Sequence, residues 1–368
     1  MPTHLPHRID RFEVVDGLVE IHGWVINEIP ISHVELIRND GEIFEVQPSQ
    51  YSIKSPDVEN IFGINAKNSR FCISIPMSFF EIPKNLLHSK LKFSFQSNSF
   101  SINLHPKKES WHSAENNSLK IGIGVCTFNR KEDVIKTIEN IKKFTNSNYF
   151  LFISDDGSSD ETELELRNID GISFVSGKNK GISWNKNRAL YYLSAIKKCD
   201  VVILLEDDTR PITYGWEIPW INAALIHGHI NLCPPWFPAP VSGAGTWDNP
   251  YLTKDLTAQC SAFSKEALNY AGYFDSRFKG YGHEHVEHTS RLIRLGYGGM
   301  KNCFLSLKSE FEFAPSQSHM SAESIERNRN LVGPLLQEVS YRSPWFSEQD
   351  LLDFREEMNS IVKINFKE

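Results

Sequence analysis

Three consecutive carboxylates follow an apolar run near the middle of the chain. Residues 201–205 read VVILL, which is typical of a buried strand, and Glu206, Asp207 and Asp208 come next. Open α/β sheets bind ligands at the carboxyl ends of their strands. Carboxylate oxygens there suit Mg²⁺ or Mn²⁺ that holds a diphosphate. The alternative is a polar turn that merely ends the strand.

Polar clusters also follow three earlier apolar runs. They lie at residues 127–130 (TFNR), 155–160 (DDGSSD) and 177–188, the last containing NKNR at its end. The second cluster is not a calcium loop of the EF-hand type, because its glycine is third instead of sixth and a strand precedes it. If the strands are parallel, all of these clusters meet at one edge of the sheet.

The elements that must position these residues alternate between strand and helix from Leu119 onward. The expected strands and helices are 120–127, 131–144, 149–154, 159–167, 172–175, 183–197 and 201–205, of which the second, fourth and sixth are helices. This alternation predicts an α/β domain with a mostly parallel sheet.

The first hundred residues have a different pattern, in which apolar and polar residues alternate. The expected strands are 12–15, 18–25, 33–37, 43–46, 71–75 and 91–97. They predict a small antiparallel β-sandwich over residues 1–107, with Trp24 packed in its core. Residues 108–118 then form a linker, 119–320 the α/β domain and 321–368 a C-terminal tail with helices at 326–339 and 348–361.

Four motifs in order resemble those of family 2 glycosyltransferases with the GT-A fold, a Rossmann-like α/β fold. They are IGIGVCTFNR at 121–130, DDGSSD at 155–160, Gly181 with Asn187, and the acidic triplet 206–208, and the similarity covers roughly residues 119–310. The resemblance implies a nucleotide-sugar site. The residues expected to bind the nucleotide-sugar are Thr127, Asn129, Arg130, Asp155, Asp156, Lys186, Asn187 and Asp207.

The same resemblance implies a metal site on the acidic triplet, with Asp208 as the preferred ligand and Glu206 beside it. Lys186 stands where the family often has arginine; it keeps the charge but lacks the planar fork. Related transferases often use a late histidine as a further ligand, which would be His319 here. A histidine in a loop is also commonly a surface residue, and that alternative stays open.

The segment 280–296 resembles the Gly-Tyr-Gly-x-Glu-Asp segment that the family shares with galactosyltransferase-like members. On a helix, Glu284, Glu287 and His288 share one face, and His285 occupies the position of the family's catalytic aspartate. An acceptor hydroxyl must lose a proton, which a carboxylate or imidazole can take. Glu284, His285 and Glu287 are the candidates, with Glu284 first, and His288 is a further candidate metal ligand. A polar helix start is the alternative.

The resemblance implies a metal-dependent, inverting glycosyltransferase that uses Mn²⁺ or Mg²⁺. Its donor would be a nucleotide-sugar, with UDP expected, and its acceptor a glycan or lipid-linked glycan of bacterial surface polysaccharide synthesis. A sugar nucleotidyltransferase would need a glycine-rich loop after the first strand, which residues 127–130 lack. A degenerate transferase that binds carbohydrate is favoured by His285 in place of aspartate. In the loop at 233–247, aromatic rings could stack on sugars or pack as a rigid crossing.

Composition excludes several other classes. The chain has 368 residues, 40% of them hydrophobic, and a net charge of -7, which argues against nucleic-acid binding. No apolar run approaches the roughly 20 residues of a membrane span, and the first residues do not form a signal peptide. Six scattered cysteines fit a reducing cytoplasm. Location at the inner face of the membrane, peripheral membrane association and a homo-oligomer stay open.

Overall fold

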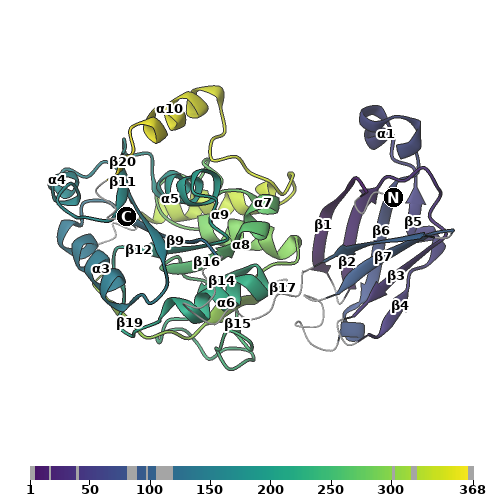
Figure 1. Cartoon of the computed structure of the whole chain (residues 1–368), viewed down its shortest axis with the longest axis horizontal. Helices are drawn as coiled ribbons and strands as arrows, with labels where there is room; N and C mark the ends of the chain where they lie inside the picture. Colours follow the sequence, from purple (N-terminus) through teal and green to yellow (C-terminus); the bar gives the residue numbers. More distant parts are fainter. Residues whose placement is uncertain are drawn as a thin grey trace. The chain divides into compact units, whose positions relative to one another are not determined.

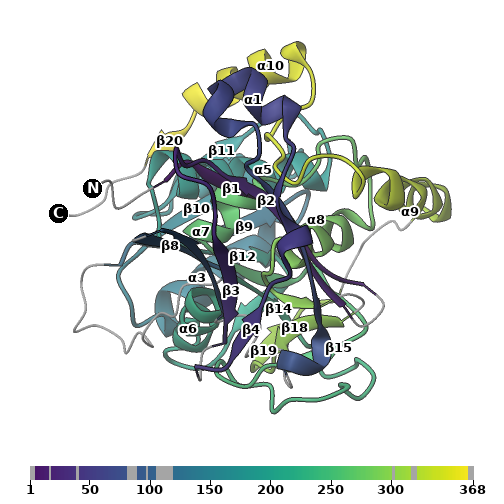
Figure 2. The same ribbon diagram turned by 90° about the vertical axis from the view of Figure 1, so that its right-hand side faces the viewer.

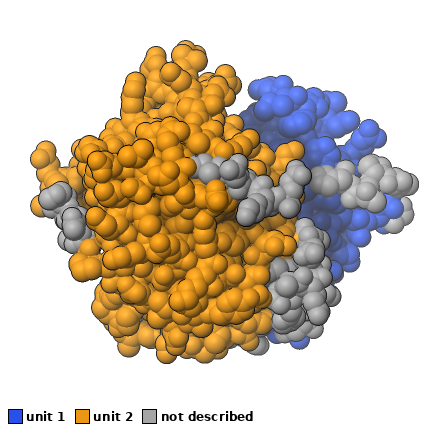
Figure 3. All heavy atoms as spheres, turned by 60° about the vertical axis from the view of Figure 1, so that its left-hand side comes forward, with its two compact units in different colours: residues 1–108, 292–302 blue, residues 109–291, 303–368 orange. Residues whose placement is uncertain are grey.

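The computed structural model describes residues 5–15, 18–38, 41–80, 89–96, 98–104, 119–300, 303–315 and 321–363. The chain forms two compact units, coloured separately in Figure 3. Unit 1 comprises residues 1–108 and 292–302, and unit 2 comprises residues 109–291 and 303–368. His319, a predicted metal ligand, lies outside the described residues.

Unit 1 contains two four-stranded antiparallel sheets, in the orders β1-β2-β6-β5 and β4-β3-β7-β8. The strands are β1 (His7–Val15), β2 (Leu18–Val25), β3 (His33–Ile37), β4 (Ile43–Glu45), β5 (Tyr51–Ile53), β6 (Arg70–Pro76), β7 (Lys90–Phe95) and β8 (Asn98–Asn103). One apolar core joins side chains of both sheets, among them Ile21, Leu36 and Phe93. The predicted antiparallel sandwich is confirmed.

Trp24 does not lie in that core. Along β2 the side chains alternate, so that Val19, Ile21 and Val25 are buried while Trp24 is on the opposite face. There its ring lies 5.3 Å from that of Phe62 in helix α1 (Pro56–Phe62), which the sequence did not predict. The expectation that Trp24 packs inward was therefore wrong.

Unit 2 is built on one large sheet with the strand order β15-β18-β14-β16-β12-β9-β10-β11-β20 (Figure 1). Its strands are β9 (Ile121–Thr127), β10 (Tyr149–Asp155), β11 (Ser173–Ser176), β12 (Val201–Glu206), β14 (His229–Leu232), β15 (Tyr251–Thr253), β16 (Cys260–Ser264), β18 (Cys303–Leu307) and β20 (Val362–Lys363). The central four strands β11, β10, β9 and β12 are parallel, and antiparallel strands flank them. The predicted α/β fold is confirmed.

The order of the parallel strands reverses between β9 and β12. The chain runs outward from β9 to β10 and β11, then returns to place β12 on the other side of β9. Such a reversal opens a crevice at the carboxyl ends of the two strands, which is where open α/β sheets bind ligands. The acidic triplet begins at the last residue of β12.

Helices cover both faces of the sheet (Figures 1 and 2). They are α3 (Lys131–Phe144), α4 (Thr162–Leu166), α5 (Ile182–Tyr191), α6 (Glu217–His227), α7 (Lys265–Ala271), α8 (Glu284–Arg294), α9 (Ala322–Leu335) and α10 (Glu348–Asn359). Helix α5 approaches β9 so closely that a Cβ at Gly124 would lie 3.0 Å from that of Ala189. The glycines of the IGIGVCT strand thus allow α5 to pack on the sheet.

Smaller elements complete the chain. They are β13 (Thr209–Pro211), β17 (Gly299–Met300), β19 (Phe311–Phe313), the 3₁₀ helices η1 (Pro48–Gln50), η2 (Ile64–Ala66) and η3 (Met77–Phe80), and the π-helix η5 (Tyr192–Ile196). The tail contains α9 and α10, where the sequence predicted helices at 326–339 and 348–361, and it also contributes β20, which pairs with β11. All six cysteines are free. Within the described residues, no helix is long and apolar enough to cross a membrane.

Candidate functional site

A buried hydrogen bond joins the carboxyl ends of the neighbouring strands β9 and β12. Thr127, the last residue of β9, donates from Oγ1 to Asp207 Oδ2 at 2.7 Å, although the two residues are 80 positions apart. Burial raises the pKa of Asp207 to about 7, against the opposing charge of Arg130. The first and last of the four motifs are therefore in direct contact.

Arg130 lies on the acidic triplet. Its Nη1 is 3.2 Å from Asp208 Oδ2 and 3.5 Å from Asp207 Oδ1, and its Nε donates to Asp133 at 3.0 Å. Burial and the nearby charge of Glu206 raise the pKa of Asp208, while Arg130 opposes them. The sequence predicted Arg130 for nucleotide binding; in the structure it neutralises the carboxylates beside that site.

The donor set at the end of β12 fits a hard divalent cation. Asp208 and Glu206 offer carboxylate oxygens, and the Glu206 side chain is partly exposed. No cluster of three or more His, Cys, Asp or Glu side chains suited to a metal occurs among the described residues. A Mg²⁺ or Mn²⁺ ion can be bound with only one or two protein carboxylates, because substrate phosphates and water complete its coordination shell.

Lys186 connects the triplet to the predicted acceptor segment. Its Nζ lies 2.9 Å from Glu206 Oε1, 3.5 Å from Glu284 Oε1 and 2.7 Å from His285 Nε2. Burial opposes the charge on Lys186, but the carboxylates of Glu206 and Glu284 outweigh it and raise its pKa. Lys186 therefore stays protonated and donates to His285 Nε2.

This contact determines the state of His285. Its pKa is far below the ordinary value because the ring is buried and faces the charge of Lys186. The ring is neutral, its Nε2 lone pair accepts from Lys186, and its proton lies on Nδ1. Glu284, at the first turn of α8, keeps a carboxylate oxygen that does not contact Lys186.

The motif after β10 is organised by its own aspartates. Asp155 accepts hydrogen bonds from the backbone and hydroxyl of Ser158 and from the hydroxyl of Ser176. Asn129, which has a left-handed φ of 52°, accepts from the Ser159 backbone at 2.8 Å. Asp155 and Asn129 thus fix this loop, in which Ser159 is exposed.

Asp156 holds the next loop onto this one. It accepts from the backbones of Lys180 at 3.1 Å and Gly181 at 2.9 Å, and from Arg188 Nη1 at 2.8 Å. Burial raises the pKa of Asp156, and Arg188 opposes that shift. Arg188 was not among the predicted site residues, although it directly follows Asn187 in the third motif.

Asn187 is fully buried and binds backbone groups of other segments. Its amide donates to the carbonyl of Phe274 at 2.8 Å and accepts from the Phe274 backbone at 2.9 Å. Its side-chain oxygen and nitrogen both bind the segment between α7 and α8, so in this structure Asn187 fixes the position of that segment.

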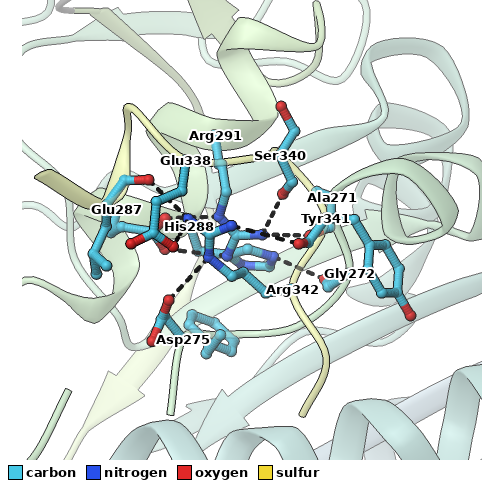
Figure 4. A network of polar contacts seen from close by, with 12 residues as sticks. Ala271, Gly272, Asp275, Glu287, His288, Arg291, Glu338, Ser340, Tyr341 and Arg342 are labelled. Carbon is cyan, nitrogen blue, oxygen red and sulfur yellow. Dashed lines mark hydrogen bonds and ion pairs between the residues drawn. The ribbon is translucent and has the colours of Figure 1, made fainter. Parts of the chain in front are cut away.

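Glu287 and His288, which lie in α8, belong to a buried network of polar contacts (Figure 4). Glu287 accepts from Arg291 Nε at 2.7 Å, and both side chains are fully buried. Arg291 also donates to the carbonyls of Tyr273 and Ser340. His288 Nε2 donates to the Gly272 carbonyl at 3.1 Å. The structure brings neither residue to Glu206 or Asp208.

The aromatic loop at 233–247 is connected to the acidic end of β12 through strand β19. Trp236 is 57% exposed, and its ring is 4.7 Å from that of Phe313 in β19. Strand β19 pairs with β13, so that Phe313 is opposite Thr209, and the Ala314 backbone donates to the Asp208 carbonyl. Trp236 is therefore an exposed aromatic ring that packs on Phe313, and the residue after Phe313 is hydrogen-bonded to Asp208.

Comparison with known proteins identifies part of the chain. Residues 123–217 match the family described as Glycosyl transferase family 2. No curated protein matches the chain.

Several solved structures are similar. The mannosyltransferase of Pyrobaculum calidifontis, in complex with GDP-Man and Mn²⁺, is 15% identical with a TM-score of 0.39. The match covers 57% of this chain and 62% of the mannosyltransferase. Residues 1–349 of S. aureus TarS are 14% identical with a TM-score of 0.42, and the match covers 66% of this chain and 72% of the TarS chain. Glucosyl-3-phosphoglycerate synthase of Mycobacterium tuberculosis, in complex with Mn²⁺, UDP and phosphoglyceric acid, is 16% identical with a TM-score of 0.39. The match covers 62% of this chain and 84% of the synthase. The match spans less than two thirds of the mannosyltransferase, and similarity at this level carries no argument about substrates.

Proposed function

We propose that this chain, which carries a family 2 glycosyltransferase domain over residues 123–217, is a metal-dependent, inverting hexosyltransferase. The donor is a nucleotide-sugar, with UDP as the proposed nucleotide. The acceptor is a glycan or lipid-linked glycan of bacterial surface polysaccharide synthesis, in the cytoplasm. We further propose that residues 1–107 are an accessory β-sandwich domain, 108–118 a linker, 119–320 the GT-A domain and 321–368 a C-terminal helical tail.

The observation that carries this proposal is the contact of Thr127 with Asp207 across the point where the strand order reverses. It supports one continuous donor site, with the nucleotide over the loops after β9 and β10 and the diphosphate over the end of β12. Asp208 and Glu206 would hold Mn²⁺ or Mg²⁺, which supplies positive charge to the departing diphosphate.

Glu284 is the proposed general base. It takes the proton of the acceptor hydroxyl as that oxygen attacks the anomeric carbon, while the bond from that carbon to the diphosphate breaks on the opposite face. His285 Nε2 accepts from Lys186 and is not free to take a proton. Glu287 is paired with Arg291. Glu284 pairs with Lys186 at 3.5 Å through Oε1, and its other carboxylate oxygen takes no part in that contact.

The proposal is tested by donor binding and transfer. Wild type should be stabilised against heat by UDP or a UDP-sugar only when Mn²⁺ or Mg²⁺ is present, because a ligand of the native state raises its melting temperature. Asp208→Ala should remove both this stabilisation and transfer. Asp170→Ala, which changes an exposed acid, is the control. Full transfer by Asp208→Ala would contradict the proposed metal site.

A degenerate, carbohydrate-binding protein is the second candidate, because Lys186 occupies the lone pair of His285 where the family has aspartate. Slow hydrolysis of a nucleotide-sugar without acceptor would exclude this alternative. Glycan binding without hydrolysis or transfer, for every donor tested, would favour it.

A further inference from the structure

The C-terminal helix α10 contacts the loop that holds Asp156. Glu357 of α10 accepts from Arg188 Nε at 2.9 Å through Oε2 and from Arg188 Nη2 at 2.9 Å through Oε1. The same Oε2 accepts from Trp184 Nε1 at 2.7 Å. The two residues of the ion pair are 169 positions apart, and Arg188 is fully buried.

Arg188 passes this constraint to the predicted nucleotide site. Its Nη1 donates to Asp156 Oδ1 at 2.8 Å, and its Nη2 donates to the Lys178 carbonyl at 2.7 Å. Gly177 makes room for the guanidinium, because a Cβ there would lie 2.4 Å from Arg188 Nη2. The arginine thus joins α10, the loop at 177–181 and the end of β10.

Two further contacts fix α10 in place. Lys180 Nζ pairs with Asp353 and lies 4.3 Å from the centre of the Trp184 ring. After α10, the strand β20 pairs with β11, the strand that leads into the loop at 177–181. The loop at 177–181 is therefore bound to the C-terminal segment directly through Lys180 and indirectly through Arg188 of α5, which binds both Glu357 and the Lys178 carbonyl.

We propose that α10 and β20 are part of the donor site, and that Glu357 is a positioning residue for the nucleoside diphosphate. Glu357 fixes Arg188, Arg188 fixes Asp156, and Asp156 fixes the backbones of Lys180 and Gly181. A carboxylate has about four lone-pair positions, and three of those on Asp156 are used. The remaining position, on Oδ2, would be the one that binds the nucleotide. This inference rests on the proposed function and deepens it.

The test compares Glu357→Gln with Glu356→Gln, which removes the same charge from an exposed neighbour on the same helix. Binding of UDP and of GDP, each with Mn²⁺, is measured by calorimetry. Glu357→Gln should weaken nucleotide binding about tenfold, the effect expected when a hydrogen bond to a charged group is lost. The kcat at saturating donor should change less than about twofold, because Glu357 does not contact the reacting atoms.

Hydrogen exchange gives a readout that needs no nucleotide. The backbone amides of Lys180 and Gly181 should exchange faster in Glu357→Gln than in wild type or Glu356→Gln, since Asp156 holds them less firmly. Asp353→Asn, which loosens only Lys180, should give a smaller effect in the same direction and serves if Glu357→Gln does not fold.

The outcomes separate the two proposals. Unchanged exchange and unchanged nucleotide affinity in Glu357→Gln would overturn the positioning role and leave the proposed function standing. If wild type binds neither UDP nor GDP, the proposed function fails and this inference fails with it. Equal loss of affinity and kcat in Glu356→Gln would also overturn it, because the effect would then come from charge on α10 in general.

Discussion

The side chain of Lys186 is shared by three residues from distant parts of the chain. It is 1% exposed and contacts Glu206, Glu284 and His285. A buried ammonium needs such partners, because an unpaired charge away from water is costly. The lysine also distinguishes the two candidate bases, since it donates directly to the histidine and is farther from the glutamate.

We therefore expect Glu284→Gln to lose transfer and His285→Gln to lose much less. General-base catalysis contributes roughly 10²- to 10⁴-fold, so kcat of Glu284→Gln should fall by about that factor while nucleotide affinity stays within about twofold. Steady-state kinetics with calorimetric binding of UDP and Mn²⁺ would measure both. A larger loss of kcat in His285→Gln than in Glu284→Gln would assign the base to the histidine.

Glu287 is expected to matter for stability instead of catalysis. Arg291→Met should lower the free energy of unfolding by about 3–5 kcal/mol, because it leaves a buried carboxylate without its partner. The double variant Glu287→Gln with Arg291→Met should recover part of that loss. Urea titrations of the three proteins would test this. Loss of kcat in Glu287→Gln at unchanged stability would instead support its sequence-based prediction as the base.

At this scale the sequence predicted residue types better than their contacts. Thr127 and Asp207 were predicted for one site and are in contact. Asn187 lies in the same motif pattern, but it binds the Phe274 backbone 87 positions away. Arg188 and Glu357 are 169 positions apart. No local periodicity or spacing carries information about such pairs, and they become visible only when the chain is folded.

Three histidine rings, those of His229, His285 and His288, are buried between the elements of unit 2. His229 Nδ1 donates to the Ala262 carbonyl and its Nε2 accepts from the Thr289 hydroxyl, both at 3.0 Å. The ring of His229 is 6.5 Å from that of His288. Burial lowers the pKa of His229 to about 4, and burial also lowers the pKa values of His285 and His288 well below their ordinary range. These rings are neutral in the folded protein.

Stability should therefore fall in mild acid. The folded-state pKa of each ring is below its unfolded value, so the unfolded chain binds protons first as the pH falls below about 6.5. Between about pH 7 and about pH 5, each such histidine should remove roughly 2 kcal/mol from the free energy of unfolding. Urea titrations across this range would measure it. Asp207 acts in the opposite direction over this range, because its pKa in the folded protein is raised to about 7. The share of one histidine is therefore measured as the difference between wild type and a variant that lacks that ring.

In the variant His229→Gln, the pH dependence should be flatter by about one histidine's share. His33→Gln, in the sandwich unit, is the matched control because that side chain is partly exposed. An equal flattening in both variants would mean that the effect is general and does not come from the buried rings.

Trp236 ends a row of aromatic side chains that runs from the core to the surface. Trp220 and Phe311 are 6.1 Å apart, Phe311 and Phe313 are 6.4 Å apart, and Phe313 and Trp236 are 4.7 Å apart, between ring centres. A ring supported in this way presents a firm apolar surface, on which the C–H face of a sugar can stack.

Trp236→Ala should raise the KM for the acceptor about five- to tenfold and leave nucleotide affinity unchanged, whereas Trp236→Phe should retain most of the activity. Tyr214→Ala, at another exposed aromatic, is the control. Kinetics with varied acceptor would measure the effect. If Trp236→Ala changes no kinetic constant, the loop is a rigid crossing, which is the alternative that its prolines suggest.

Long periodic elements could be predicted from sequence, and short ones could not. Helix α3 was expected at 131–144 and is found there, because Val134, Ile138 and Ile141 define one buried face. Strand β20 has two residues, too few for any pattern. Its pairing with β11 comes from tertiary structure, and it makes the tail part of the sheet.

Unit 1 has a cluster of large apolar side chains on its surface. On α1 and η2, Ile61 is 76% exposed, Ile64 is 69% exposed and Phe62 is 49% exposed, with the ring of Trp24 beside that of Phe62. Folded proteins rarely leave several large apolar side chains together in water without a binding role. A carbohydrate-binding surface would suit a transferase that extends a polymer.

If this cluster holds the growing glycan, its effect must depend on acceptor length. Trp24→Ala should raise the KM for a long acceptor about fivefold, which corresponds to one aromatic contact of about 1 kcal/mol, and leave the KM for a short acceptor unchanged. Leu18→Ala, at another exposed apolar residue of unit 1, should change neither. Kinetics with a mono- or disaccharide and with a long oligosaccharide would distinguish the cases. An equal effect on both acceptors would show that Trp24 acts through stability, and no effect on either would mean that this face does not bind the glycan.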